Sequence, residues 1–298
     1  MNISLNFSQN TFLKRIAIIF CLVSVLSCKS TGLKIGNLDV GKLVEQGANV
    51  FNASQITDEQ EAQFGLNMSA VLLGARGIYQ DNELNLYVNK VGRWLALNSS
   101  RPSLSWQFAV IDSTAINAFA APGGYVFITL GMLNQIQNEA QLAAVLAHEI
   151  VHVTEQHHIN EIQYGTYQNA LTEALFVSAQ AYQANTGASS EQKQYSAWAK
   201  QVTTMAQDLY AKGLNREDEL QADRVGIHLL AKAGYDPFAF VDNLHIINSI
   251  AADDSALALL YKTHPSPEDR LASIETELES LLSVDGLLLT KRFHLHMP

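Results

Sequence analysis

Apolar residues recur every three to four positions along most of this chain, which is the spacing of one buried helix face. The spacing predicts helices over these stretches: from residue 57, 82–97, 138 to about 157, within 165–212, 216–233, and onward to about residue 282. Two short runs favour strands instead, at 106–111 and 125–129. We therefore expect an α+β domain that is mostly α, with a small β-sheet.

Local signals place the ends of several elements. Asn138 is a residue type that caps helices, and Gln141 lies three positions later, where it can complete the cap. Gly234, followed by Pro237, is expected to end the helix that begins near Arg216. Between the two strands, Pro122-Gly123-Gly124 predicts a turn that lets another backbone come close.

The first 27 residues have the pattern of an export signal. Lys14 and Arg15 precede an uncharged, largely apolar run over residues 16–27, which is too short to span a bilayer. The run ends in Val-Leu-Ser before Cys28, which resembles a bacterial lipobox. We expect removal of residues 1–27 and lipidation of Cys28, and cleavage of an ordinary secretory signal nearby is the alternative.

The mature chain is then expected to have three parts. Residues 28–55, which contain four glycines, are predicted to be a lipidated tether. The main domain covers 56–275, and 276–298 form a C-terminal tail without a firm interpretation. Cys21 leaves with the signal, so that an internal disulfide is excluded and the domain must be stabilised by its core.

Composition and charge exclude several classes of partner. Hydrophobic residues make up 48% of the 298 residues and charged residues 16%, which suits a folded domain. The net charge of −10 becomes −12 when Lys14 and Arg15 are removed. Binding to nucleic acid or to anionic lipid through bulk electrostatics is therefore not expected, and the lipid on Cys28 is the only expected membrane attachment.

The strongest chemical signal is AHEIVHVTEQHH at residues 147–158, because it contains H-E-x-x-H. His148 and His152 are four positions apart, which separates them by only about 40° around a helix, so both imidazoles can face one ion. Glu149 lies about 100° from His148, where a carboxylate can reach water beside that ion. This spacing suits zinc-dependent hydrolysis, which requires a third protein ligand.

Two solutions exist for that third ligand. His158 has the required distance from His152, but that arrangement needs a glycine where this chain has Glu155, so we reject it. The alternative is a glutamate on a later helix. The segment after Asn215 resembles the R-x-x-E-x-x-A-D motif of the gluzincin peptidases grouped with the CAAX prenyl endopeptidase and the HtpX-like proteases, and the motif maps onto Arg216, Glu219, Ala222 and Asp223.

The resemblance covers about residues 57–271. Further stretches resemble the family's N-A-F-x-x-P-G-G, A-G-Y-D-P and H-P motifs, at 117–124, 233–237 and 264–265, with Arg270 downstream. The chain departs from the family at Gln141 and Gln221, where glutamate is common, and it lacks the spanning helices of the membrane-embedded members. It looks closest to the exported, lipid-anchored or periplasmic bacterial members.

The resemblance implies a zincin-like helical domain, with the small sheet beside the active-site helix, and a zinc-dependent endopeptidase. One Zn²⁺ per chain would be held by His148, His152 and Glu219. Glu149 would be the general base, and Asp223 would orient a ligand histidine. Arg270 and His264 would stabilise the oxyanion, although in some relatives the histidine that matches His264 instead blocks the open zinc position.

Substrate is expected to bind as an added β-strand along residues 125–129, taken to be a sheet edge, with Gly123, Gly124 and Tyr125 in contact with it. His157 is expected to be structural. The expected substrates are misfolded or misassembled exported proteins on the periplasmic side of the envelope. Lys29, after Cys28, favours the outer membrane. The alternatives are a chaperone-like factor for outer-membrane protein assembly with little or latent peptidase activity, and a zinc hydrolase that does not cleave peptides.

Overall fold

The computed structural model describes residues 34–35, 38–39, 58–161, 212–250 and 254–297. The predicted signal, Cys28 and the helices predicted within 165–212 lie outside the described residues. Of the predicted tether, only β1 (Lys34–Ile35) and β2 (Leu38–Asp39) are described. They form a short antiparallel pair, in a unit separate from the main domain. In the described part of the chain, no helix has both the length and the apolar character needed to cross a membrane.

The remaining elements confirm an α+β fold that is mostly α. The helices are α3 (Asp58–Ala75), α4 (Asn82–Leu97), α5 (Leu130–Leu133), α6 (Glu139–Thr154), α9 (Arg216–Lys232), α10 (Phe238–Ser249), α11 (Leu260–Thr263), α12 (Pro267–Leu281) and α13 (Thr290–His294). The strands are β3 (Gln107–Ile111), β4 (Ala118–Ala121) and β5 (Tyr125–Thr129). The predicted boundary between residues 275 and 276 falls inside α12.

The three strands form one mixed sheet in the order β3-β5-β4. β5 pairs in parallel with β3 and antiparallel with β4, so the expectation that residues 125–129 form a sheet edge is wrong. The edges are β3 and β4. Along β3, the side-chain oxygens of Asn85 and Asn89 on α4 accept hydrogen bonds from the backbone N–H groups of Val110 and Phe108.

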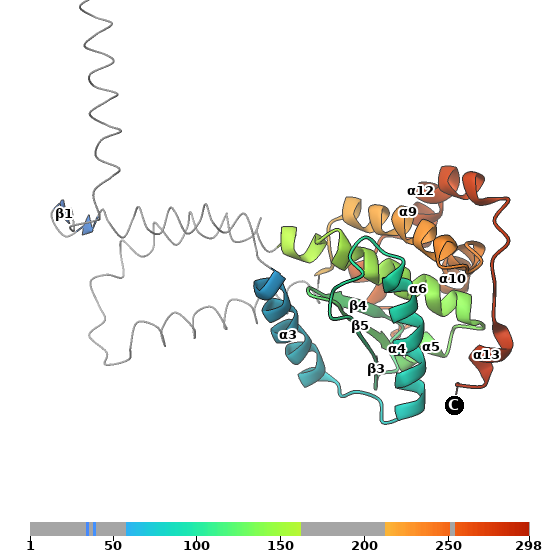
Figure 1. Cartoon of the computed structure of the whole chain (residues 1–298), viewed down its shortest axis with the longest axis horizontal. Coiled ribbons are helices and arrows are strands. Elements are labelled where there is room, and N and C mark those ends of the chain that lie inside the picture. The colour runs from blue at the N-terminus through green and yellow to red at the C-terminus, as the bar shows by residue number, and fades with distance from the viewer. Residues whose placement is uncertain (1–33, 36–37, 40–57, 162–211, 251–253, 298) are drawn as a thin grey trace, which may run out of the picture. The chain divides into compact units, whose positions relative to one another are not determined.

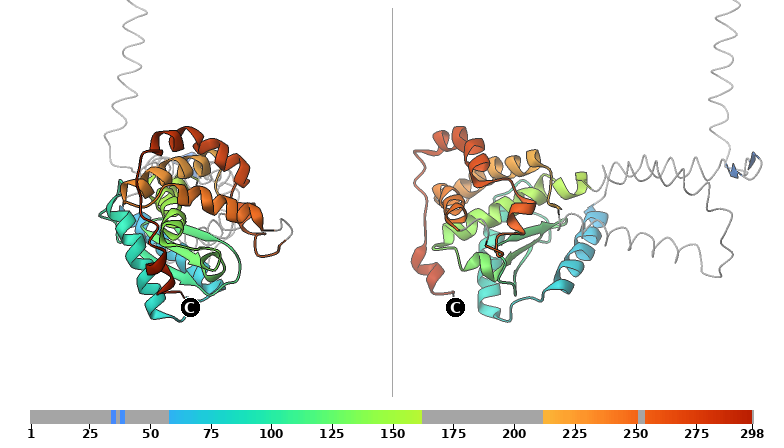
Figure 2. Two further views of the ribbon diagram at one scale, coloured as in Figure 1. Left: turned by 90° about the vertical axis from the view of Figure 1, so that its right-hand side faces the viewer. Right: turned by 180° about the vertical axis from the view of Figure 1, so that it is seen from behind.

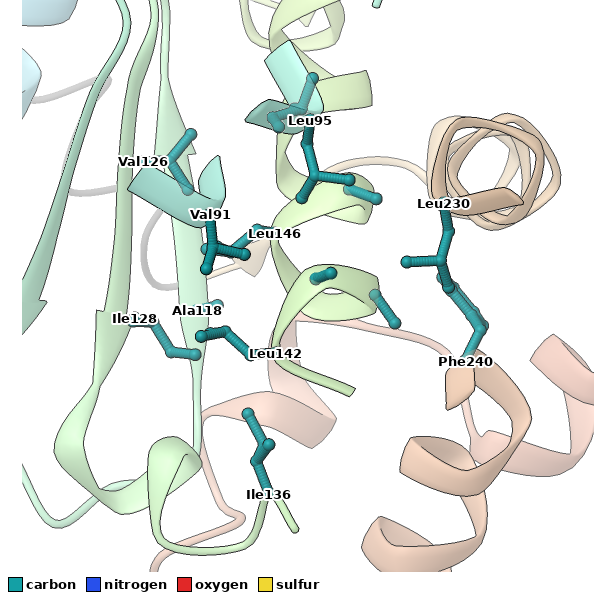
Figure 3. Close-up of a cluster of buried hydrophobic side chains, with 14 of the residues drawn as sticks. Val91, Leu95, Ala118, Val126, Ile128, Ile136, Leu142, Leu146, Leu230 and Phe240 are labelled. Carbon is teal, nitrogen blue, oxygen red and sulfur yellow. The ribbon is translucent and has the colours of Figure 1, made fainter. Parts of the chain in front are cut away.

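Helix α6 is the centre of the fold. It lies between the sheet on one side and α9 and α10 on the other (Figure 1), while α3 packs against β4 and β5 on the opposite side of the sheet. Leu142 and Leu146 of α6 point toward the sheet, and Leu230 of α9 and Phe240 of α10 lie on the other side of the helix (Figure 3). Gly226 of α9 faces the backbone of α6 at His148, where even a Cβ would lie at an ordinary contact distance of 3.4 Å.

Helix α6 begins where the sequence predicted but ends earlier than predicted. Asn138 caps the helix by accepting a hydrogen bond from the N–H of Gln141, as predicted. The other end comes earlier than about residue 157, because the helix stops at Thr154 and Gln156 has a φ of 58°. A new helical turn begins at His157.

The segment after α12 folds back onto the domain, as the two views in Figure 2 show. Leu287 pairs with the turn at Gly234–Asp236, and Phe293 of α13 is 1% exposed. Arg292 contacts Glu139, which is fully buried in the first turn of α6 and also accepts hydrogen bonds from the hydroxyls of Tyr87 at 2.9 Å and Tyr235 at 2.7 Å. Burial alone would raise the pKa of Glu139, but these donors outweigh it and lower the pKa.

Candidate metal centre

Four side chains from three helices converge beside the C-terminal half of α6. His148 and His152 come from α6, Glu219 from α9, and His264 from the end of α11, and one ligand atom from each lies within 4.8 Å of the others. The two Nε2 atoms of His148 and His152 are 3.0 Å apart. Glu219 lies 3.5 Å from the Nε2 atoms of His148, His152 and His264.

Local structure explains this convergence. The four-residue spacing puts both histidines on one face of α6, and α9 packs along α6 so that Glu219 faces them. Glu219 is 2% exposed, and its Oε2 atom accepts no hydrogen bond from the described residues. Burial alone would raise the pKa of Glu219, but the imidazoles of His264 and His148 and the guanidinium of Arg270 outweigh it and lower the pKa. A buried carboxylate with an unused oxygen among three imidazoles is a donor set suited to a divalent cation.

Asp223 orients the first of these histidines. Its Oδ1 atom is 2.9 Å from Nδ1 of His148, so His148 donates that N–H and keeps Nε2 for a cation. Arg270 on α12 binds both oxygens of Asp223, from Nε at 2.9 Å and from Nη2 at 2.6 Å. Burial alone would raise the pKa of Asp223, but the charge of Arg270 outweighs it and lowers the pKa to about 2.

Glu149 lies between two pockets that also share Ala118 and His264. It is 3% exposed, and burial raises the pKa of its carboxyl to about 7 in the protein alone. The first pocket is mostly apolar and is lined by residues of α5, α6, α10 and α11, among them Met132, Leu244 and Leu260. The second follows β4 from Ala118 to Ala120 and reaches Met68 and Leu72 of α3.

Gly123 and Gly124, which were predicted to contact substrate, have structural roles in the turn between β4 and β5. Gly123 has a φ of 78°, and its N–H donates to Oε1 of Glu61 at 3.0 Å. Gly124 has a φ of 102°, and a Cβ there would lie 3.2 Å from the backbone of Trp106. Of the sheet and its turns, the described residues that line the two pockets belong to β4 or directly precede it, and Gly123, Gly124 and Tyr125 line neither pocket.

His158 and His157 occupy different places in the site. His158, rejected as a ligand, is outside the group of four but lines the second pocket. His157, expected to be structural, has its Nδ1 atom 2.9 Å from Nδ1 of His152, a contact that the sequence pattern did not suggest. A continuous helix would carry residue 157 about 140° around from residue 152, so helical spacing argues against the contact.

Two histidines and a glutamate on neighbouring helices, with a second glutamate beside them in a cleft, are the arrangement of a metal-dependent hydrolase. Comparison with known proteins agrees with that class. The chain belongs to peptidase family M48, whose model matches residues 82–278.

Three relatives show the extent of the similarity. The chain is 31% identical over 227 residues to a putative beta-barrel assembly-enhancing protease of Vibrio cholerae, and 30% identical over 225 residues to the beta-barrel assembly-enhancing protease of Escherichia coli strain K12. It is also 28% identical over 206 residues to the mitochondrial metalloendopeptidase OMA1 of Schizosaccharomyces pombe. These matches cover 73%, 74% and 68% of this chain. They cover 44%, 44% and 55% of the relatives, so the chain spans less than half of the two bacterial proteins.

Proposed function

We propose that this chain is a zinc-dependent endopeptidase that cleaves misfolded or misassembled exported proteins. The observation that carries the proposal is the convergence of His148, His152 and the unsatisfied Oε2 of Glu219 beside the buried carboxyl of Glu149. Membership in a peptidase family supports hydrolysis of a peptide bond as the reaction.

The donor set fits zinc in kind and in spacing. Zinc in proteins takes imidazole nitrogen and carboxylate oxygen at about 2.0–2.2 Å, so tetrahedral ligand atoms lie roughly 3.4 Å apart. The nitrogen–nitrogen distance of 3.0 Å and the nitrogen–oxygen distances of 3.5 Å lie near that value. His148, His152 and Glu219 would hold the ion, which supplies Lewis-acid activation of water and of the scissile carbonyl.

Glu149 is the proposed general base and acid. It takes a proton from the attacking water and delivers the proton to the amine that leaves. A group works best in both directions when its pKa is near the working pH, and burial of Glu149 raises its pKa to about 7. Asp223 holds His148 through Nδ1, and Arg270 holds Asp223. This arrangement favours a positioning role for Arg270 over the predicted contact with the oxyanion.

The edge of β4 is the proposed seat for the substrate backbone. β4 is one edge of the sheet, and Ala118, Phe119 and Ala120 line the pocket that leads to Glu149 and His152. An extended peptide added to this edge would gain main-chain hydrogen bonds with little selection by side chain. The apolar pocket on the other side of Glu149, lined by Met132 and Leu244, would receive an apolar substrate side chain.

His264 is proposed to be a fourth, removable zinc ligand. Its Nε2 atom lies 3.5 Å from Oε2 of Glu219 within the same group of four. In that position it would occupy the place needed by water. His264→Ala is therefore expected to raise the rate of casein cleavage at an unchanged zinc content. A lower rate at the same zinc content would favour the oxyanion role instead.

Metal content is the direct test of the proposed site. The purified chain, analysed by elemental analysis without added zinc, is expected to contain about one zinc per molecule, as a three-ligand site predicts. Substitution of both histidine ligands from α6, as in His148→Ala/His152→Ala, removes two of the three proposed donors and is expected to abolish binding. A folded wild-type chain that contains no zinc and takes up none would contradict the proposal.

The setting of the enzyme also belongs to the proposal. Residues 1–27 would be removed as the signal, and a lipid would be attached to Cys28. Residues 28–55 would then tether the domain to the periplasmic face of the outer membrane. Placement among the CAAX prenyl endopeptidase and HtpX-like proteases belongs to the same proposal. Two relatives are named beta-barrel assembly-enhancing proteases, which supports the assembly machinery for outer-membrane proteins as a partner. The same names support the second candidate function, a chaperone-like assembly factor with latent peptidase activity.

A further inference from the structure

His157 is a buried imidazole to which the proposed reaction assigns no role. It is 2% exposed, and its Nδ1 atom is 2.9 Å from Nδ1 of His152. We propose that His157 is a positioning residue for His152: it accepts the Nδ1–H of His152 and thereby reserves Nε2 of His152 for the metal. This inference rests on the proposed zinc site and adds a residue to it.

The direction of the hydrogen bond between His157 and His152 follows from the contacts on the opposite side of the His157 ring. Nε2 of Gln221 donates to the carboxylate of Glu155 at 3.3 Å, because a carboxylate can only accept. The Oε1 atom of Gln221 is then the atom that faces Nε2 of His157 at 3.2 Å, and Asp218 adds a second oxygen 4.0 Å away. Oxygen acceptors require that Nε2 of His157 carry the hydrogen.

A neutral imidazole has one donor and one acceptor nitrogen. With the hydrogen on Nε2, the Nδ1 atom of His157 presents a lone pair to His152, so His152 must donate from Nδ1. Its Nε2 atom is then unprotonated and faces Nε2 of His148 at 3.0 Å and Oε1 of Glu219 at 3.5 Å, inside the group of four. The chain Glu155–Gln221–His157 thus selects the tautomer of His152 that can bind a metal.

The backbone is shaped for this contact. In an unbroken helix, residue 157 would face about 140° away from residue 152. The chain instead turns at Gln156, whose φ of 58° lies in the left-handed region that residues other than glycine rarely adopt. The side chain of Gln156 donates to Glu61 at 3.1 Å, which holds the turn in place. A turn of this rare conformation that brings His157 into contact with His152 favours a positioning role for His157 over mere packing.

The two proposed ligand histidines therefore have different partners. His148 is held by a carboxylate, Asp223, whose charge is balanced by Arg270. His152 is held by an imidazole at the end of a chain of side chains that reaches Glu155 at the C-terminal end of α6. The second arrangement orients its ligand without burying another negative charge near Glu219.

The test compares two variants at position 157 in the full chain. His157→Phe fills the site but offers no acceptor, whereas His157→Asn keeps an oxygen that can accept from Nδ1 of His152. Loss of a partner that orients a metal ligand typically weakens metal affinity about 10–100-fold. We therefore expect the zinc dissociation constant of His157→Phe, measured by competition with a chelator, to rise by about that factor. His157→Asn is expected to recover most of the loss. His228→Phe, at an exposed position of α9, is the matched control and should bind as wild type does.

A second measurement needs no variant. Nitrogen NMR of the metal-free wild-type chain, labelled at histidine, should show His152 with its hydrogen on Nδ1. A hydrogen on Nε2, or an unchanged zinc affinity in folded His157→Phe, would overturn the inference while leaving the zinc site intact. A folded wild-type chain that binds no zinc would overturn the proposed function and the inference together.

Discussion

Replacing Glu149 with glutamine is expected to abolish peptide cleavage while the zinc site stays filled. The substitution keeps the size of the side chain and removes only its ability to carry the proton from water to the leaving amine. General acid–base catalysis contributes about 10²–10⁴-fold, so kcat for casein cleavage should fall by at least the lower figure. Because Glu149 is outside the group of four ligand atoms, zinc content should stay near that of wild type.

Glu217→Gln is the matched control. Glu217 is an exposed carboxylate on α9 that pairs with Arg224, so the same chemical change should leave cleavage unaltered there. Undiminished cleavage by Glu149→Gln would remove Glu149 from the mechanism. The variant also separates the two candidate functions in cells, because an assembly factor that works by binding would still complement a deletion and a protease would not.

Replacing Arg270 with leucine is expected to destabilise the fold by about 3–5 kcal/mol. Arg270 and Asp223 form an ion pair whose side chains are 9% and 0% exposed. Removal of the cation leaves a buried carboxylate with one hydrogen-bond partner fewer, which is the costly way to break such a pair. Urea unfolding with zinc removed by a chelator measures the change in the free energy of unfolding without the contribution of metal binding.

Arg216→Leu provides the comparison for that measurement. Arg216 pairs with Asp269 at 3.0 Å, but the two side chains are 62% and 43% exposed, so its loss should cost only about 0–1 kcal/mol. The double variant Arg270→Leu/Asp223→Asn removes both charges and should recover part of the lost stability. If Arg270→Leu unfolded at the same urea concentration as Arg216→Leu, the pair would not stabilise the site.

The sequence predicted the parts of the candidate site that depend on local geometry. His148, Glu149 and His152 share one helix, where spacing alone fixes their relative directions. The caps at Asn138 and Gly234 were predictable for the same reason, since each involves neighbours in sequence. Glu219 lies 67 residues after His152 and was suggested only by resemblance to a family, not by any periodicity.

Other features depend on contacts between distant segments, which periodicity does not encode. β4 is a four-residue Ala-Phe-Ala-Ala strand of low intrinsic strand preference, so its position at the sheet edge was missed and β5 was placed there instead. The turn at Gln156 was missed because glutamine rarely adopts positive φ, and Glu61, 95 positions earlier, helps to hold it. His157 was expected to be structural, and no periodicity indicated its contact with His152.

The fold-back of the C-terminal segment also means that the first turn of α6 has a partner from near the end of the chain. Arg292, which neutralises Glu139 in the first turn of α6, is synthesised after the whole stretch that matches the family model. Until residues 287–293 emerge, α6 carries a buried carboxylate without its cation, and the sheet-side core must form around it. The first turn of α6 therefore gains its full set of partners only after residues 287–293 have been synthesised.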